Sequence, residues 1–451
     1  MCEKAFTPLL SLVPACRAAT EAGMELVLSR FEKNTNYPFV DTKLSTLSGK
    51  DFPEPADKET DFRGRSAVFC WIQGRGLEAL AGHAAFLADR PELAARCDRM
   101  LKTVAVNLAS LSAVNKGRFV FLSTPEGRPF RMGADGRREY FAAKSIPPSF
   151  AGIFTGKGLI AAGARLKSKK LRDLGISTFR SATSVIVSGK FVSDQISFDK
   201  KNPSVPVPNR LAQGPWMISL GGYALLCELF PDSDEWVEGG STFLRHILEG
   251  HVIKKVAGPL RRYDFIEWTD IEGRPWIEKG KITQDPGHAL EFTGLAARFL
   301  LKAGARASLS PDFSGLLAAC RKDLPEIFLS AFNNGFRKEA GGICKTVDLV
   351  SRMPLNDDMP WWPLPEAMRA AALLLRLAPD HPRRAEIVSA AVECSRALFG
   401  PFRSPVPGLF LQTRDARGEP SPVIPATPDA DPGYHTGLSL IDFIKACEEL
   451  K

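Results

Sequence analysis

The sequence predicts an all-helical protein, arranged as an (α/α)6 barrel of six helical hairpins with long loops at one end. Apolar residues recur every three or four positions in roughly twelve windows, the pattern of helices with one buried face. The windows follow one another in pairs joined by short polar turns, so each pair predicts a hairpin. Closing such hairpins into a ring gives one set of inner helices and one set of outer helices.

The predicted helices have recognisable ends. Most windows run roughly 14 to 20 residues, and Gly250 and Gly304 close two of them. Asp285 is a suitable N-cap, and Pro286 suits the first helical position that follows. The windows begin near residues 16, 75, 92, 148, 168, 215, 235, 286, 310, 361, 384 and 435.

Longer connections separate the hairpins. Some contain β-like alternation, as at residues 118–122, which precede a turn at residues 125–127. In a barrel these connections emerge at the same end, and loops of this length usually carry function. They span residues 34–70, 114–146, 186–214, 253–285, 331–360 and 401–434.

The segment KNPSVPVPNR, from Lys201 to Arg210, is the best candidate for a linker between domains. The sequences on its two sides are alike in character, however. Several helical barrels of this length form one unit. We therefore expect a single domain over residues 1–451.

Composition excludes several classes of protein. The chain is 44% hydrophobic and 24% charged, as in an ordinary soluble protein. Its net charge of +8 is spread along the chain, whereas nucleic-acid binders usually concentrate basic residues on one face. No run of 18 apolar residues suggests a membrane span, and the N-terminus makes a poor signal peptide. The nine cysteines lack a CxxC pair, which favours reduced thiols and a cytoplasmic location.

His288 is the first candidate for acid–base chemistry. It lies in the run DPGHALE at residues 285–291, in the first turn of a predicted helix. There the helix dipole disfavours imidazolium, and a neutral imidazole can act as a general base. Glu291 is three residues further on the same face and could orient the ring or bind a hydroxyl. The alternative is a buried histidine whose ring is satisfied by a backbone carbonyl.

His435 and Arg75 are also at predicted loop–helix junctions. His435 follows Gly433 and Tyr434 at the start of the last predicted helix, which places it at the same end as His288. Arg75, at the end of WIQGR (residues 71–75), cannot lose its proton and can stabilise an enediolate by charged hydrogen bonds. The alternative for Arg75 is a surface residue paired with Glu78.

Two tryptophans precede another predicted helix, in the run WWPLPE at residues 361–366. Exposed Trp361 and Trp362 beside the carboxylate of Glu366 are typical of a platform on which a sugar ring stacks. The alternative is a pair of core residues. Paired carboxylates for glycoside hydrolysis also stay open, since their separation in space is invisible in the sequence.

The other histidines have simpler explanations. His83 lies near an apolar face and fits the core, and we expect the remaining three at the surface: His246, His251 and His381. No HExxH motif, zinc-type cysteine spacing, Gly-rich phosphate loop or GxSxG motif occurs. The sequence therefore predicts neither a metal nor a cofactor.

Taken in order, WIQGR, DPGHALE, WWPLPEA and the GYH near the C-terminus resemble the N-acylglucosamine 2-epimerase family. That superfamily includes cellobiose 2-epimerases and aldose–ketose isomerases of mannose-like sugars. The resemblance runs from about residue 60 to the end of the chain. It implies an (α/α)6 barrel, the fold that the helical windows also predict.

The resemblance also implies roles for residues. His288 and His435 match the two histidines that act as acid and base, and Arg75 matches the arginine at the substrate oxygen where the enediolate forms. Lys281 is the nearest basic residue ahead of the PGH motif. The substrate-binding residues implied are Glu291, Trp361, Trp362, Glu366 and Lys281.

The sequence departs from the family pattern in two places. A further histidine that many relatives carry on the helix around Met217 is missing, which leaves ring opening to another group. An arginine expected shortly after the last histidine is replaced by the run from Thr436 to Leu438. These differences suggest an altered substrate or, in the extreme, a protein that binds sugars without converting them.

The sequence as a whole predicts an isomerase that epimerises a sugar at C2 by removing and returning a proton. An aldose–ketose isomerase of a mannose-like sugar is the alternative, because the same residues serve both reactions. From other classes, a non-catalytic sugar-binding relative and a lyase or hydrolase on the same barrel stay open. The partner expected is a small sugar, without nucleic acid or membrane, and a homodimer is one assembly open to it.

Overall fold

The computed structural model describes residues 3–142, 144, 149–191, 207–256, 258–423 and 429–450. Their main elements are α-helices, and the windows predicted from the sequence coincide with helices to within a few residues. One short helix, α1, was not predicted. The helices are α1 (Glu3–Leu10), α2 (Val13–Lys33), α3 (Cys70–Phe86), α4 (Pro91–Val114), α5 (Phe150–Arg165), α6 (Lys169–Val187), α7 (Gly214–Leu229), α8 (Asp234–Gly250), α9 (Pro286–Ala303), α10 (Pro311–Gly335), α11 (Pro363–Leu377), α12 (Arg384–Phe399), the π-helical turn η3 (Tyr434–Leu438) and α13 (Ser439–Glu448).

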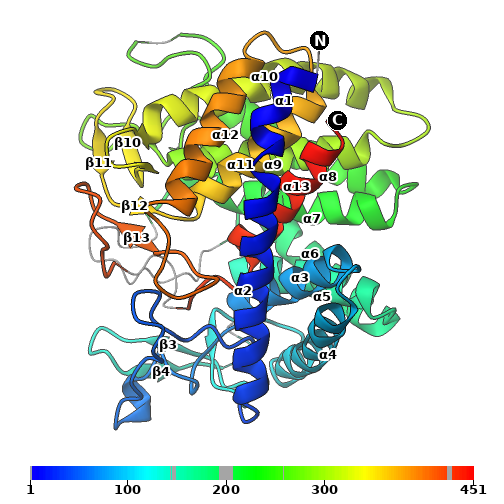
Figure 1. Ribbon diagram of the computed structural model, residues 1–451, viewed down its shortest axis with the longest axis vertical. Helices are drawn as coiled ribbons and strands as arrows, with labels where there is room; N and C mark the ends of the chain where they lie inside the picture. The colour runs from blue at the N-terminus through cyan, green and yellow to red at the C-terminus, as the bar shows by residue number, and fades with distance from the viewer. Residues whose placement is uncertain are drawn as a thin grey trace.

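The helices form two concentric rings. Around the inner ring, α3, α5, α7, α9, α11 and the unit of η3 with α13 each pack against the next, and η3 closes the ring on α3. Each of α4, α6, α8, α10 and α12 packs outside the inner helix that precedes it, and α2 packs outside α13. The long α2 crosses the front of the molecule in Figure 1.

Burial separates the inner helices from the outer ones. Along α11 nearly every position is buried, and along α5 the first fourteen positions are. A helix that is apolar on all sides is stable only inside a core. In α8, by contrast, charged residues such as Asp234 and Glu235 begin the helix, and the buried positions follow one face. Apolar patterning thus assigns each helix to its ring.

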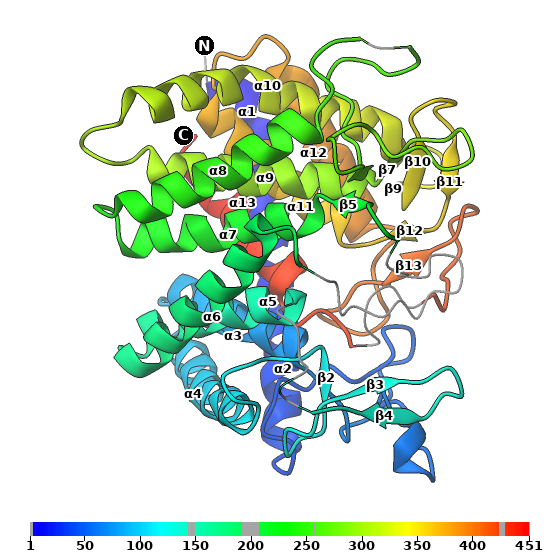
Figure 2. The same ribbon diagram turned by 180° about the vertical axis from the view of Figure 1, so that it is seen from behind.

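All the described strands lie in the connections that lead from an outer helix to the next inner helix. They gather at the left in Figure 1 and at the right in Figure 2, where the molecule is seen from behind. The predicted clustering of the long loops at one end is therefore observed. The strands are β1 (Val68–Phe69), β2 (Leu122–Ser123), β3 (Phe130–Met132), β4 (Arg138–Tyr140), β5 (Leu211–Ala212), β6 (Trp268–Thr269), β7 (Thr283–Gln284), β8 (Phe336–Arg337), β9 (Gly342–Ile343), β10 (Thr346–Asp348), β11 (Pro354–Asn356), β12 (Met359–Pro360) and β13 (Thr413–Arg414).

These strands pair in small antiparallel sheets that link different connections. β1 pairs with β2, β5 with β6, and β12 with β13, while β10 lies between β7 and β11. The β-like alternation at residues 118–122 gives a strand only from Leu122, because just Leu122 and Ser123 find a partner, in β1. The inner helices α3, α7, α9 and α11 begin within three residues of such strands, so the sheets fix where their N-termini lie.

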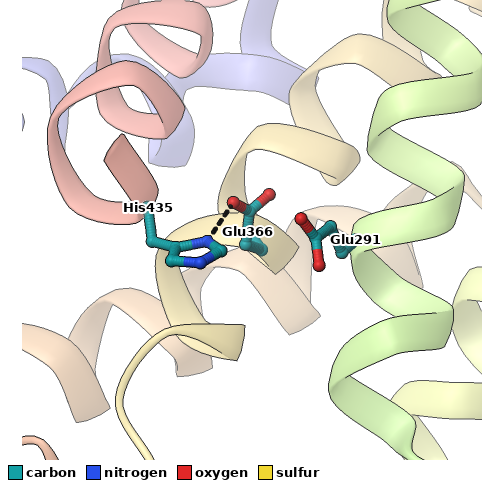
Figure 3. Close-up of side chains that lie close together, drawn as sticks. All are labelled: Glu291, Glu366 and His435. Carbon is teal, nitrogen blue, oxygen red and sulfur yellow. Dashed lines mark hydrogen bonds and ion pairs between the residues drawn. The ribbon is translucent and has the colours of Figure 1, made fainter. Parts of the chain in front are cut away.

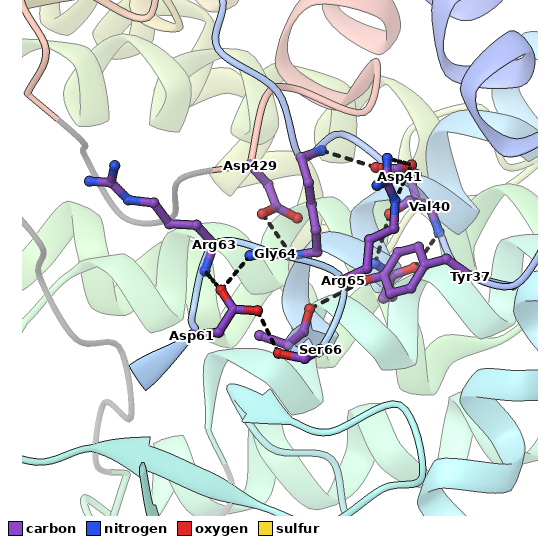
Figure 4. A network of polar contacts seen from close by, with 12 residues as sticks. Tyr37, Val40, Asp41, Asp61, Arg63, Gly64, Arg65, Ser66 and Asp429 are labelled. Atoms are coloured by element: carbon purple, nitrogen blue, oxygen red, sulfur yellow. Dashed lines mark hydrogen bonds and ion pairs between the residues drawn. The ribbon is translucent and has the colours of Figure 1, made fainter. Parts of the chain in front are cut away.

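A network of ion pairs joins the first long connection to the last (Figure 4). The buried carboxylate of Asp41 is in ion pairs with Arg30 at 3.0 Å and Arg65 at 2.8 Å. Buried Lys43 reaches Asp429, just ahead of η3, at 3.2 Å. Buried charges are tolerated only when paired, and these pairs anchor the segment that carries His435.

The single domain over residues 1–451 stays a prediction. Most of the linker candidate, residues 201–206, lies outside the described residues. The eight described cysteines are free and buried, as expected. No helix among the described residues is long and apolar enough to cross a membrane.

Candidate active site

The N-terminal ends of four inner elements meet where the long connections gather. They bring together His288 and Glu291 from α9, Glu366 from α11, His435 from η3 and Arg75 from α3. Figure 3 shows the carboxylates of Glu366 and Glu291 beside the imidazole of His435. Helix N-termini carry partial positive charge, so this end of the barrel is suited to an anion.

His288 is held by carboxylates on both sides. Asp285 caps α9, as predicted, by accepting the backbone N–H of His288 at 3.2 Å. The Nδ1 atom of the imidazole lies 3.1 Å from Oε1 of Glu267 and 3.4 Å from Asp285. The alternative of a ring satisfied by a backbone carbonyl is therefore wrong.

The prediction that His288 is neutral is also wrong. Burial opposes its charge, but the carboxylates of Asp285 and Glu267 outweigh burial and raise its pKa to about 9. A helix dipole contributes less than a carboxylate in contact. At neutral pH this imidazole is a proton donor.

His435 has the opposite environment. Asp431 caps η3 by accepting the backbone N–H groups of Tyr434 at 2.9 Å, His435 at 3.2 Å and Thr436 at 2.8 Å. The side chain is buried, with Nδ1 2.9 Å from Oε1 of Glu366. Burial, and then the positive charge of Arg75, lower its pKa to about 3. A neutral ring that donates Nδ1–H to Glu366 keeps the lone pair of Nε2 for a proton.

Glu366 is buried at the centre of this group. Its Oε1 also accepts the hydroxyl of Ser439 at 3.1 Å, and its Oε2 is in an ion pair with Arg369. Burial raises the pKa of Glu366 to about 7, against the opposing effect of Arg369. Burial and the nearby Glu366 also raise the pKa of Glu291. Glu366 thus orients His435, and Glu291 is a second buried carboxyl beside them.

Arg75 lies in a box of aromatic rings. Its guanidinium carbon is 4.3 Å from the ring centroid of Phe154, 4.5 Å from that of Trp71 and 5.0 Å from that of Tyr434. Its Nε is buried and has no hydrogen-bond partner within the described ranges. The alternative pairing with Glu78 is wrong, because Glu78 lies 3.1 Å from Lys157. Arg75 therefore offers its donors to a ligand.

The two tryptophans are nearly buried, at 7% and 8% exposure, so the expectation of exposed rings is wrong. Trp361 donates its Nε1–H to Thr436 at 3.2 Å and is a core residue. The ring of Trp362 has its centroid 5.5 Å from that of His288 and 5.5 Å from that of His435. Trp362 therefore lies close to both histidines.

Lys281 is not brought to the site. It is exposed, in a turn where its backbone pairs with Glu278. Lys345, from β9–β10, is the lysine near His288: its Nζ lies 2.6 Å from Asp285 and 5.6 Å from the ring centroid of Trp362. No local pattern points to Lys345, because it comes from the following connection.

Three groups could offer ligands to a metal: Glu291, Glu366 and His435 have ligand atoms within 4.8 Å of one another. Arg369 already balances Glu366, and Arg75 places a further positive charge close to His435. A cation would have to displace these interactions. The cluster is better suited to proton transfer than to metal binding.

Sequence reasoning assigned the other histidines only in part. His83 is fully buried, as expected, with Nδ1 2.7 Å from the carbonyl of Ala79. His251 and His381 are buried rather than at the surface, and His246 stacks on Trp216. The long connections cover these histidines, which no local pattern shows.

Three functional residues were missed. Glu267 lies in the connection that leads to α9, 21 residues before His288, and left no local signal. Asp431 lies two residues before the N-cap Gly433, and its carboxylate accepts three backbone N–H groups of η3. Lys157 is the one lysine in the apolar run of α5, and such an isolated charge signals a buried partner.

A helical barrel that gathers at one end two histidines with opposite pKa shifts and an arginine whose Nε has no partner among the described residues is suited to moving protons on a small molecule. Residues 180–437 match the family model of N-acylglucosamine 2-epimerase (GlcNAc 2-epimerase). The chain belongs to this family. It is accordingly an isomerase, either a sugar 2-epimerase or an aldose–ketose isomerase. Arg75 lies outside the matched residues, and a search of curated proteins finds no match.

Solved structures confirm the (α/α)6 fold. A sugar epimerase from a ruminal bacterium has a TM-score of 0.67 at 11% identity, over 96% of this chain and 98% of its own. Cellobiose 2-epimerase from Spirochaeta thermophila has a TM-score of 0.65 at 12% identity, over 98% of both chains. A D-mannose isomerase has a TM-score of 0.62 at 13% identity, over 94% of this chain and 97% of its own.

Proposed function

We propose that the chain is a sugar 2-epimerase in which His435 and His288 move the proton at C2 and Arg75 stabilises the enediolate. The observation that carries the proposal is the pair of imidazoles whose ring centroids each lie 5.5 Å from that of Trp362, with pKa values driven apart to about 3 and about 9. Environments that separate two pKa values in this way assign one group as base and the other as acid.

In the proposed reaction, Nε2 of His435 removes the proton from C2 of the open-chain sugar. The electron pair of that C–H bond moves into the C1–C2 bond, and the carbonyl oxygen becomes the oxyanion beside Arg75. The imidazolium of His288 then donates its proton to C2 from the opposite face, which restores the carbonyl and inverts the centre. An acid–base group contributes about 10²–10⁴-fold to such a rate.

Delivery of the proton to C1 instead of C2 would give an aldose–ketose isomerase. The similarity in fold to a D-mannose isomerase supports this alternative. A sugar-binding relative without catalysis is disfavoured, because binding alone does not require two histidines whose pKa values are driven in opposite directions. A lyase or hydrolase would consume the sugar rather than exchange its proton.

Proton exchange separates these functions. The enzyme is incubated in heavy water with N-acetylglucosamine, cellobiose or mannose, and deuterium at C2 is followed by NMR. Deuterium at C2 with formation of the 2-epimer supports the epimerase, and a ketose product supports the isomerase. Cleavage without exchange into the intact sugar would contradict both.

The missing histidine on α7 bears on ring opening. Met217 is buried, and the first turn of α7 presents Gln213, whose amide lies 3.4 Å from Glu267. We propose that ring opening depends on the Glu267–His288 pair, the nearest acid–base group. We further propose a cytoplasmic location, supported by the buried, free thiols.

The value of kcat/KM should rise as the pH increases through about 7 and should fall above about 9. Below about 7 Glu366 takes up a proton, and it then no longer accepts the Nδ1–H of His435. Above about 9 His288 loses the proton that it must donate. The pH profile of kcat/KM reports these free-enzyme groups. A profile that is flat across this range would contradict both assignments.

Activity should survive chelation. Glu366, the central residue of the three that could bind a metal, is already engaged with His435 and Arg369. The test is turnover before and after prolonged dialysis against a chelator, with the metal content measured in parallel. Complete loss of turnover that a divalent ion restores would overturn the metal-free mechanism.

A further inference from the structure

A buried ion pair lies one helical turn below Arg75. Glu78 is three residues after Arg75 on α3, where side chains share a face and an arginine and a glutamate readily pair. Its carboxylate lies instead 3.1 Å from Nζ of Lys157, with the two side chains 8% and 1% exposed. Glu78, the carboxylate on α3 that could pair with Arg75, is thus paired with Lys157 instead.

The fold fixes Lys157 in this position. At Gly74 and Gly158, α3 and α5 approach backbone to backbone: a Cβ on Gly74 would lie 2.5 Å from the carbonyl of Phe154, and one on Gly158 would lie 2.3 Å from that of Gly74. On α7, a Cβ on Gly221 would lie 3.0 Å from Nζ of Lys157. These glycines bring the ammonium between the helices and leave it room.

Lys157 also contacts Tyr434, the third aromatic residue around Arg75. Its Nζ donates to the hydroxyl of Tyr434 at 2.8 Å, and the ring of Tyr434 lies under the guanidinium of Arg75. Tyr434 directly precedes His435. The buried ammonium of Lys157 therefore contacts two groups near Arg75. One is the carboxylate of Glu78, the nearest along α3, and the other is Tyr434, whose ring packs against Arg75.

We propose that Lys157 is a positioning residue that keeps Arg75 available to the substrate oxyanion by holding Glu78 away from it. This inference rests on the role proposed for Arg75. Loss of Lys157 removes the ion-pair partner of Glu78, whose i, i+3 spacing from Arg75 on α3 then allows its carboxylate to turn to the guanidinium. The arginine is then neutralised in the ground state and no longer stabilises charge in the transition state.

The test compares Lys157→Met, Glu78→Gln and the double variant. Lys157→Met should lower C2 proton exchange by about tenfold or more. The double variant should recover to within about threefold of the wild type, because it has no carboxylate left to compete for Arg75. Glu78→Gln alone leaves Arg75 free and should exchange at a similar rate, with a lower Tm. A merely structural ion pair predicts instead that the double variant is at least as impaired as Lys157→Met.

Two further measurements complete the test. Modification of Arg75 by butanedione, read by peptide mass spectrometry, should slow in Lys157→Met and recover in the double variant, whether or not a sugar reacts. Lys302→Met breaks the ion pair of Lys302 with Glu228 at 2.8 Å, at the far end of the barrel, and should leave exchange unchanged. If Lys157→Met does not fold, the proposal is tested with Glu78→Gln and the double variant. Loss of C2 proton exchange in either of them overturns the proposal.

These outcomes separate the two proposals. An Arg75→Ala variant that keeps exchange refutes the proposed role of Arg75. An Arg75→Ala variant that loses exchange, beside a Lys157→Met variant with normal exchange and normal butanedione modification, refutes only the role of Lys157.

Discussion

Replacement of Arg75 by alanine should lower C2 proton exchange by about 10²–10³-fold, and equally for both epimers, because both pass through the same enediolate. The neighbouring cations cannot substitute for it. Lys157 is paired with Glu78, Arg369 with Glu366, and Lys345 with Asp285. The aromatic rings around Arg75 exclude water, so the lost charge would not be replaced by solvent.

The measurement is deuterium wash-in at C2, started from each pure epimer. Arg75→Lys is the matched control: it retains the charge but not the planar fork of donors, and it should fall between the wild type and Arg75→Ala. A normal rate of wash-in for Arg75→Ala would remove the arginine from the mechanism. An effect on one epimer alone would assign it to binding of that epimer rather than to the enediolate.

The fold could be predicted because each helix carries its own signal. The apolar residues of α8 follow one face, and α11 is apolar on nearly all sides, so the sequence distinguishes outer from inner helices. The N-cap at Asp285 could likewise be predicted from the residues next to it in the sequence. Strand bounds were not predictable, since Leu122 and Ser123 become a strand only by pairing with β1.

The site could be predicted only as far as its residues lie at helix starts. His288, His435 and Arg75 all do, and the barrel brings those starts together. What the sequence could not show is the charge contributed by residues that are distant along the chain. Glu267 is 21 residues before His288 along the chain, yet its carboxylate reverses the expected protonation of that histidine. Lys281 was chosen for its closeness in sequence, whereas Lys345 is the lysine close in space.

The two histidines should differ in what remains when each is replaced. His288→Asn and His435→Asn should each abolish net epimerisation, a loss of about 10²–10⁴-fold, because one proton must leave and another must arrive. In His288→Asn, exchange should persist from the epimer whose C2 proton faces His435. His435 is neutral in the resting enzyme, so this exchange should depend little on pH above about 7, where Glu366 is ionised.

In His435→Asn the remaining base is His288, which is protonated at neutral pH. Exchange should therefore come only from the opposite epimer and should increase about tenfold per pH unit until its pKa of about 9 is reached. Glu267→Gln, added to His435→Asn, removes one of the carboxylates that raise this pKa, so the plateau should then begin at lower pH. Wash-in at C2 for each pure epimer, measured across the pH range, tests all of these outcomes. Near-normal net conversion by either single variant would contradict the two-histidine mechanism, and the buried carboxyl of Glu291 would then be the group to replace next, because it lies beside His435 and Glu366.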